Sequence, residues 1–207
     1  MLVAVVNDKG GCGKTTLATA IAETGARYWE RALLCDLDAQ GSAARWAQLA
    51  GSRGHPLEAS AVVLNVRPSD LAARLANLRA ETYPLVVLDL GPGDPKRIGA
   101  AVALADLVVI PSRPTPADLD RTWRILDLAE TAERPAIVVA TMVRAGTVAL
   151  AAARDAMADA GAVLATTVLP LREAIARSFG YPIRGELATF GETLLAELVA
   201  YYRKVSP

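Results

Sequence analysis

The sequence has few side chains of the kinds that hold zinc, form disulfides or build a histidine-based catalytic triad. Its 207 residues include one histidine, His55, and two cysteines, Cys12 and Cys35, which do not have metal-ligand spacing. A single histidine argues against a zinc site or a His-based triad. Two cysteines make no disulfide framework, so we expect reduced thiols, as in a cytosolic protein.

Net charge and long apolar runs are also missing. Lysine plus arginine and aspartate plus glutamate each total 22, so any nucleic-acid binding must come from a local patch. No apolar run is long enough to cross a bilayer. The first residues run straight into Asn7-Asp8-Lys9 without the features of a signal peptide. We therefore expect a soluble, cytoplasmic protein.

Hydrophobic residues make up 53% of the chain and alternate between short β-branched runs and longer helical patterns. Expected strands are 2–6, 32–35, 61–66, 85–88, 107–110, 136–140 and 163–168. Expected helices are 15–27, 42–49, 69–80, 117–131, 147–160 and 171–179, with an amphipathic helix over 187–204 closing the fold. This order predicts an α/β fold, one domain over residues 1–207 with a doubly wound, mostly parallel sheet flanked by helices. Ligands bind such sheets at the carboxyl ends of the strands.

The segment Lys9-Gly10-Gly11-Cys12-Gly13-Lys14-Thr15-Thr16 follows the first strand and opens the first helix. In this context glycines let backbone N–H groups approach phosphates, and the helix N-terminus adds its dipole. We expect Lys14 to bind the β- and γ-phosphates and the Thr15 hydroxyl to ligate Mg²⁺. A standard phosphate loop has a glycine where Asp8 stands. A glycine-rich turn without a ligand is the alternative, which two lysines and two threonines disfavour.

Two other strands end in carboxylates. Asp36 and Asp38 end the second strand, and Asp89 ends the strand 85–88 in the manner of a Walker B strand. We expect Asp89 to hold Mg²⁺ through water. An Asp-x-Asp pair at a strand end is often only a helix cap. Beside a phosphate loop, however, it indicates a site that orients a nucleophile.

Together these motifs resemble the ParA/MinD family of deviant Walker A ATPases, P-loop NTPases whose loop carries an extra lysine, here Lys9. The family's Asp-x-Asp-Pro-Gln pattern is matched from Asp36 to Gln40 except at Ala39. The segment Asp89-Leu90-Gly91-Pro92-Gly93 varies from Asp-x-Pro-Pro, and we interpret it as a γ-phosphate sensor. Because the first expected strand starts at residue 2, the resemblance is to the short ParA type without an N-terminal DNA-reading domain.

The resemblance implies roles for particular residues. Lys9 would reach across an ATP-bound homodimer and, with Lys14, stabilise transition-state charge. Asp38 would position the attacking water, and both Asp36 and Asp38 would lie near Mg²⁺, with Asp36 closer to its water shell.

The resemblance also places the nucleobase. Thr141 stands where many relatives have an adenine-contacting asparagine. Leu169-Pro170-Leu171-Arg172 resembles the segment that packs on the base, although core packing explains Leu169 and Leu171 equally well.

In ParA proteins, basic residues late in the chain bind DNA without reading its sequence, in a salt-dependent way. The candidates here, each of which could instead be a solvated surface charge, are Arg172, Arg177, Arg184, Arg203 and Lys204.

The implied function is a nucleoid-associated partition or positioning ATPase with slow intrinsic turnover. Its ATP-bound dimer would bind non-specific DNA until a small ParB-like or adaptor partner stimulates hydrolysis. The cargo could be a plasmid, a chromosome region or a protein organelle such as a carboxysome. Alternatives are a MinD-like membrane-cycling regulator, a VirC-like transfer-DNA factor, and a metabolic enzyme of dethiobiotin synthetase type. Glu192 and Glu197 in the last helix argue against stable membrane association.

Overall fold

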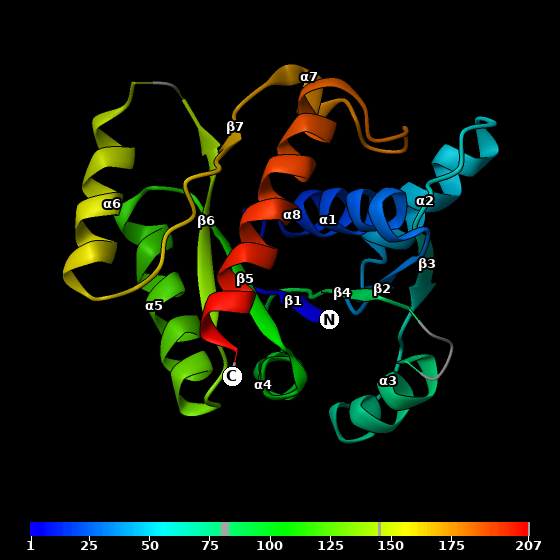
Figure 1. The fold of residues 1–207 in the computed structure, drawn as a ribbon, viewed down its shortest axis with the longest axis horizontal. Helices are drawn as coiled ribbons and strands as arrows, with labels where there is room; N and C mark the ends of the chain where they lie inside the picture. Colours follow the sequence, from blue (N-terminus) through cyan, green and yellow to red (C-terminus); the bar gives the residue numbers. More distant parts are fainter. Residues whose placement is uncertain (80–82, 145, 207) are drawn as a thin grey trace.

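The computed structural model describes residues 1–79, 83–144 and 146–206, and its centre is a twisted parallel sheet (Figure 1). In this part of the chain the sheet has seven strands in the order β3-β2-β4-β1-β5-β6-β7. The strands are β1 (Leu2–Val5), β2 (Ala32–Asp36), β3 (Ser60–Val63), β4 (Leu85–Asp89), β5 (Leu107–Ser112), β6 (Ala136–Val143) and β7 (Leu169–Pro170). Every described pairing is parallel, which confirms the predicted fold class.

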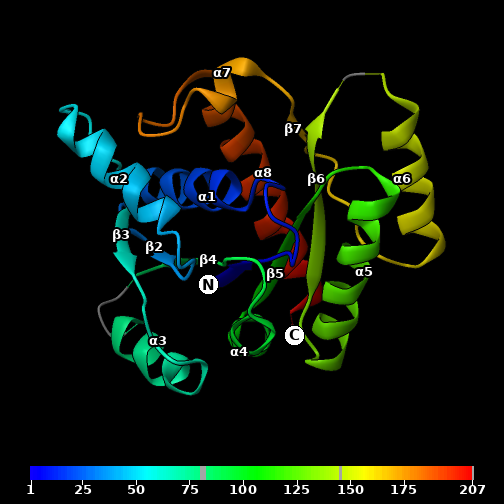
Figure 2. The ribbon, with the colours of Figure 1, turned by 180° about the vertical axis from the view of Figure 1, so that it is seen from behind.

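Helices cover both faces of the sheet (Figures 1 and 2). One face carries α1 (Lys14–Trp29), α2 (Ser42–Ser52), α7 (Glu173–Ala176) and α8 (Gly185–Val205). The other carries α3 (Leu71–Arg79) after a 3₁₀ turn (Pro68–Asp70), α4 (Pro95–Leu104), α5 (Pro116–Thr131) and α6 (Val148–Asp159). None of the helices in the described ranges has the length and hydropathy needed to span a bilayer.

Strand β1 shows why a continuous apolar run belongs at the centre. Its side chains alternate in direction, so Val3 and Val5 pack under α1 and α8 while Leu2 and Ala4 pack under the opposite layer. All four are buried, as a strand covered on both faces requires.

Two predicted elements near the C-terminus are wrong. The expected strand 163–168 is only an isolated bridge at Leu164, because the N–H groups of Thr166 and Thr167 donate to the Glu197 carboxylate at 2.6 and 3.0 Å instead of to a strand. The expected helix 171–179 shrinks to α7, since Arg172 is still extended before it.

Other boundaries also differ from the prediction. The sequence patterns missed α4, which begins at an Asp94 cap whose side chain accepts from the Arg97 N–H at 3.0 Å. Strand β3 is shorter than the expected 61–66, and its first residue is Ser60. The expected helix 69–80 is present as α3, and its predicted end at Ala80 lies outside the described residues.

Candidate nucleotide-binding site

The phosphate loop lies between β1, at the centre of the sheet, and the first turn of α1. Gly13 caps α1 with a φ of 91°, and Gly11 has a φ of 68°, so both adopt the left-handed region that favours glycine. The Lys14 side chain is buried and curls back over the loop, where its ammonium donates to the Lys9 carbonyl at 2.7 Å. The predicted loop therefore has the strand–loop–helix geometry of a phosphate site.

Lys9, the extra lysine of the loop, extends away from Lys14 and toward α5. Lys9 Nζ lies 3.5 Å from Asp118 Oδ1, and its side chain is 40% exposed whereas that of Asp118 is 6% exposed. Lys9 is thus at the surface of the loop, next to a carboxylate at the start of α5.

The three predicted acids meet at the carboxyl ends of β2 and β4. Asp36 and Asp89 are paired residues of the two neighbouring strands. Asp36 is fully engaged, since its carboxylate accepts from the N–H groups of Asp38 at 3.0 Å and Ala44 at 2.9 Å. Its pKa is raised, mainly by burial.

Asp89 has no such support. Both of its carboxylate oxygens are buried without a hydrogen-bond partner among the described residues. Its pKa is raised to about 7, mainly by burial; the nearby Thr15 hydroxyl and Lys14 ammonium lower it in part, and the charges of Asp36 and Asp38 raise it further. An orphaned buried carboxylate near a threonine hydroxyl is the arrangement that a magnesium ion satisfies.

The acids alone do not form a cation cage. In the described part of the chain, no group of three or more His, Cys, Asp or Glu side chains could together hold a metal ion. Mg²⁺ usually keeps several waters and binds through one or two protein ligands plus phosphate oxygens. Thr15 and Asp89 therefore fit a magnesium ion that arrives with a nucleotide.

The loop after β4 touches both the phosphate loop and Asp38. A Cβ at Gly91 would lie 2.8 Å from Asp38 Oδ1, so only glycine permits this approach. The Gly93 N–H of the same loop donates to Asp8 Oδ1, at the start of the phosphate loop, at 3.2 Å. The segment predicted to sense the γ-phosphate is thus in contact with the residues that would surround it.

A pocket of about 210 Å³ opens beside Gly13 and Thr16. The predicted base-contacting residues Pro170, Leu171 and Arg172 line it, as does Leu169. Sequence patterns missed its remaining walls, which are Trp46, Met142, Ile175, Ala176 and Phe179. The ring centroids of Trp46 and Phe179 lie 5.4 Å apart. No local sequence pattern predicts this contact.

Two features show how β6 shapes this pocket. The pairing with β7 shifts register at Met142, which has a left-handed φ of 53°. Backbone strain of this kind persists where surrounding structure enforces it, often at functional sites. Thr141 does not line the pocket; its buried hydroxyl donates to the Cys12 carbonyl at 2.8 Å and so supports the phosphate loop from below.

The predicted DNA-binding residues fall into two groups. Arg172, Arg177 and Arg184 lie around α7 and the start of α8, where the first two pair with Glu186 at 3.4 Å and Glu173 at 3.3 Å. The others, Arg203 and Lys204, lie in the last turn of α8. A helix rises about 1.5 Å per residue, so about 30 Å separates the groups within one chain.

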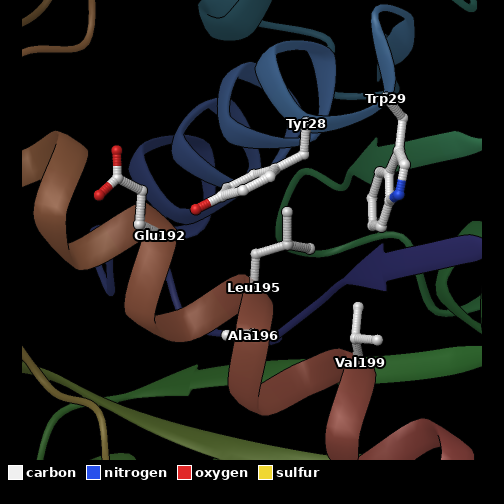
Figure 3. Close-up of a pocket in the computed structure, with 6 residues that line it drawn as sticks. All are labelled: Tyr28, Trp29, Glu192, Leu195, Ala196 and Val199. Atoms are coloured by element: carbon white, nitrogen blue, oxygen red, sulfur yellow. The ribbon is translucent and has the colours of Figure 1, made fainter.

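A second hollow, of about 240 Å³, lies at the far end of α1 (Figure 3). Tyr28 and Trp29 of α1 face Leu195, Ala196 and Val199 of α8 across it. Its only charged lining side chain is Glu192, which repels phosphates. This hollow is therefore a poor fit for a nucleotide.

Comparison with known proteins agrees with this geometry. Residues 3–182 match the model of the CobQ/CobB/MinD/ParA nucleotide-binding domain. The chain belongs to this family. The matched region thus includes the phosphate loop, both acid strands and every residue that lines the pocket.

Individual relatives match over part of their length. The carboxysome distribution protein A of Gloeobacter kilaueensis is 41% identical over 120 residues, which cover 57% of this chain and 51% of the relative. The chromosome-partitioning ATPase Soj of Thermus thermophilus is 35% identical over 132 residues, 53% of each chain. The matched regions thus span about half the length of these relatives.

Solved structures share the fold across nearly the whole chain. The cell division ATPase MinD of Pyrococcus furiosus superposes with a TM-score of 0.77 at 16% identity, covering 97% of this chain and 98% of that one. The pNOB8 ParA bound to nonspecific DNA superposes with a TM-score of 0.66 at 15% identity, covering 99% of each chain. These likenesses establish the MinD/ParA type of P-loop fold.

Proposed function

We propose that the protein is a Mg²⁺-dependent ATPase that switches between nucleotide states to partition or position a cargo along DNA. The observation that carries this proposal is the pairing of a two-lysine phosphate loop with the orphaned Asp89 carboxylate. A bound magnesium ion would polarise the phosphates and neutralise charge that develops on them.

The chain's own residues divide the remaining work. Lys14 would move from the Lys9 carbonyl onto the β- and γ-phosphates, and Thr15 and Asp89 would hold the ion. Asp38, half-exposed beside Gly91, orients the attacking water. Leu171 and Phe179 cover the base in the neighbouring pocket.

Dimerisation makes Lys9 part of a second site. Its exposed ammonium can leave Asp118 and reach the nucleotide of a facing copy, where it stabilises transition-state charge as an arginine finger does. ATP then joins two subunits, and hydrolysis releases them. A stimulating partner of ParB-like or adaptor type would set the lifetime of this dimer.

The relatives suggest where the dimer acts. Two are named for carboxysome distribution and chromosome partitioning, and one structural neighbour holds nonspecific DNA. In this chain, the basic residues around α7 would bind the phosphate backbone, and the dimer would present two such surfaces. The proposed location is the nucleoid.

Light scattering of the purified protein tests the switch. We expect a monomer without nucleotide or with ADP, and a dimer with Mg²⁺ and a non-hydrolysable ATP analogue. Lys9→Ala should stay monomeric while retaining the analogue, whereas Lys14→Ala should lose binding altogether. The matched control is Lys204→Ala, which removes an exposed lysine in the last turn of α8, far along the chain from the phosphate loop; it should dimerise normally. A single mass in every nucleotide state contradicts the proposal.

A further inference from the structure

Three consecutive residues at the start of the phosphate loop contact one face of α5. All three contacts join residues more than 100 positions apart in the sequence. They are Asn7 Nδ2 to Thr122 Oγ1 at 3.4 Å, Asp8 Oδ2 to Arg121 Nη1 at 3.1 Å, and Lys9 Nζ to Asp118 Oδ1 at 3.5 Å. Residues three or four apart share a helix face, so α5 meets the loop as one surface.

Asp8 differs from its neighbours because its second partner lies in the loop after β4. Its Oδ1 accepts from the Gly93 N–H at 3.2 Å, while its Oδ2 pairs with Arg121. Gly93 belongs to the loop that follows Asp89, next to Pro92 and Gly91. One carboxylate thus connects the loop after β4 to α5.

We propose that Asp8 is a positioning residue that couples the loop after β4 to α5, so that the nucleotide state sensed near Gly93 reaches the start of α5. The proposal rests on the proposed function, because it assumes that this loop responds to a γ-phosphate. It goes further by assigning a role to Asp8, which stands where a standard phosphate loop has glycine.

The start of α5 is where such a displacement matters. Asp118 is held rigidly, since Thr115 donates its hydroxyl to Asp118 Oδ2 at 2.5 Å and caps the helix. The other carboxylate oxygen is buried and accepts no hydrogen bond from the described residues, and Lys9 is its charged neighbour. A displacement of α5 that is transmitted through Arg121 therefore changes the strength of the ion pair between Asp118 and Lys9.

The coupling is adjustable because its ion pair is partly solvated. The side chains of Asp8 and Arg121 are 30% and 43% exposed. Partly exposed pairs change an equilibrium constant by up to about fivefold, so loss of this pair should weaken the coupling without unfolding the protein.

Hydrogen exchange of the full chain, with and without Mg²⁺ and a non-hydrolysable ATP analogue, tests the coupling. In the wild type we expect the analogue to alter exchange in both residues 91–94 and residues 116–123. In Asp8→Ala and Arg121→Gln, the response of 91–94 should persist and that of 116–123 should fall by up to about fivefold. Asp8→Asn keeps an acceptor for Gly93 and should behave like Arg121→Gln.

Arg124→Gln is the matched control. It removes an ion pair to Asp120 at 3.2 Å on the exposed side of the same helix, so both segments should respond as in the wild type. A normal response of 116–123 in both Asp8→Ala and Arg121→Gln would overturn the coupling and leave the proposed ATPase intact. A wild type that responds in neither segment would instead contradict the proposed function, and the coupling with it.

Discussion

Replacing Asp89 with asparagine should stabilise the nucleotide-free protein at neutral and alkaline pH. This buried carboxylate, which has no hydrogen-bond partner among the described residues, has a pKa of about 7, compared with an ordinary aspartate value of 3.8. A difference of about 3 pKa units corresponds to about 4 kcal/mol of unfavourable free energy once the group is ionised. Asparagine keeps the shape of the side chain without the charge, so it removes this penalty.

The sign of the pH dependence follows from proton binding. Between about pH 4 and pH 7, the folded protein retains a proton on Asp89 that the unfolded chain has lost. The free energy of unfolding therefore falls as pH rises through this window and then levels off. The buried carboxyl of Glu23 also has a raised pKa, but it remains in both proteins and cancels in the difference. Asp36 lies beside Asp89, so in Asp89→Asn it also loses a neighbouring like charge, which adds to the gain in stability.

Urea unfolding at a series of pH values from 4 to 8 measures this difference. We expect Asp89→Asn to gain a few kcal/mol over the wild type at pH 8 and almost nothing at pH 4. Asp120→Asn, which changes an exposed carboxylate, serves as a control and should show no such trend. A gain that does not vary with pH, or a loss at pH 8, would refute the assignment of Asp89 as an ionisable, unsupported carboxyl. The same variant should lose ATP hydrolysis, because it lacks the carboxylate proposed to hold Mg²⁺.

Two other predictions concern packing and loop support. Gly191→Ala should destabilise the fold by about 1–3 kcal/mol in urea, because the added methyl would lie 2.5 Å from Thr24 Oγ1 between α8 and α1. Gly51→Ala, which meets nothing within 4 Å, should instead be neutral or slightly stabilising. Thr141→Val should lower the free energy of unfolding by about 1–3 kcal/mol, because the buried Cys12 carbonyl loses its hydrogen-bond donor. It should also weaken nucleotide binding. Calorimetry measures both quantities, and Thr141→Ser, which keeps the hydroxyl, is the control.

The sequence predicted those parts of the site that a short stretch of chain encodes. The phosphate loop needs only a strand, glycines and a helix start, all within residues 2–29, and the structure has each of them. The strand before Asp89 was likewise predictable, because residues 85–88 form a continuous apolar run that ends in an acid. Because the carboxyl ends of parallel strands share one edge, the meeting of Asp36 and Asp89 also followed from the fold.

The remainder depends on contacts between distant residues. Trp46 and Phe179 form pocket walls through a ring contact that neither local pattern indicates. The expected strand at 163–168 failed because the Glu197 side chain, 30 or more positions away, takes its N–H groups. From the sequence, Asp8 was only a residue that departs from the phosphate-loop motif. Its contacts could not be predicted, because its partners Gly93 and Arg121 lie 85 and 113 positions away.

Binding to DNA tests most directly whether the nucleotide site controls a positioning switch. The purified protein would be titrated against a random-sequence duplex at several salt concentrations, with ADP and with ATP plus Mg²⁺. We predict binding that weakens steeply with salt, requires ATP and disappears in Lys14→Ala. An absence of binding in every nucleotide state, or binding that is equal with ADP and ATP, would contradict a DNA-based switch and favour a membrane-cycling or metabolic relative.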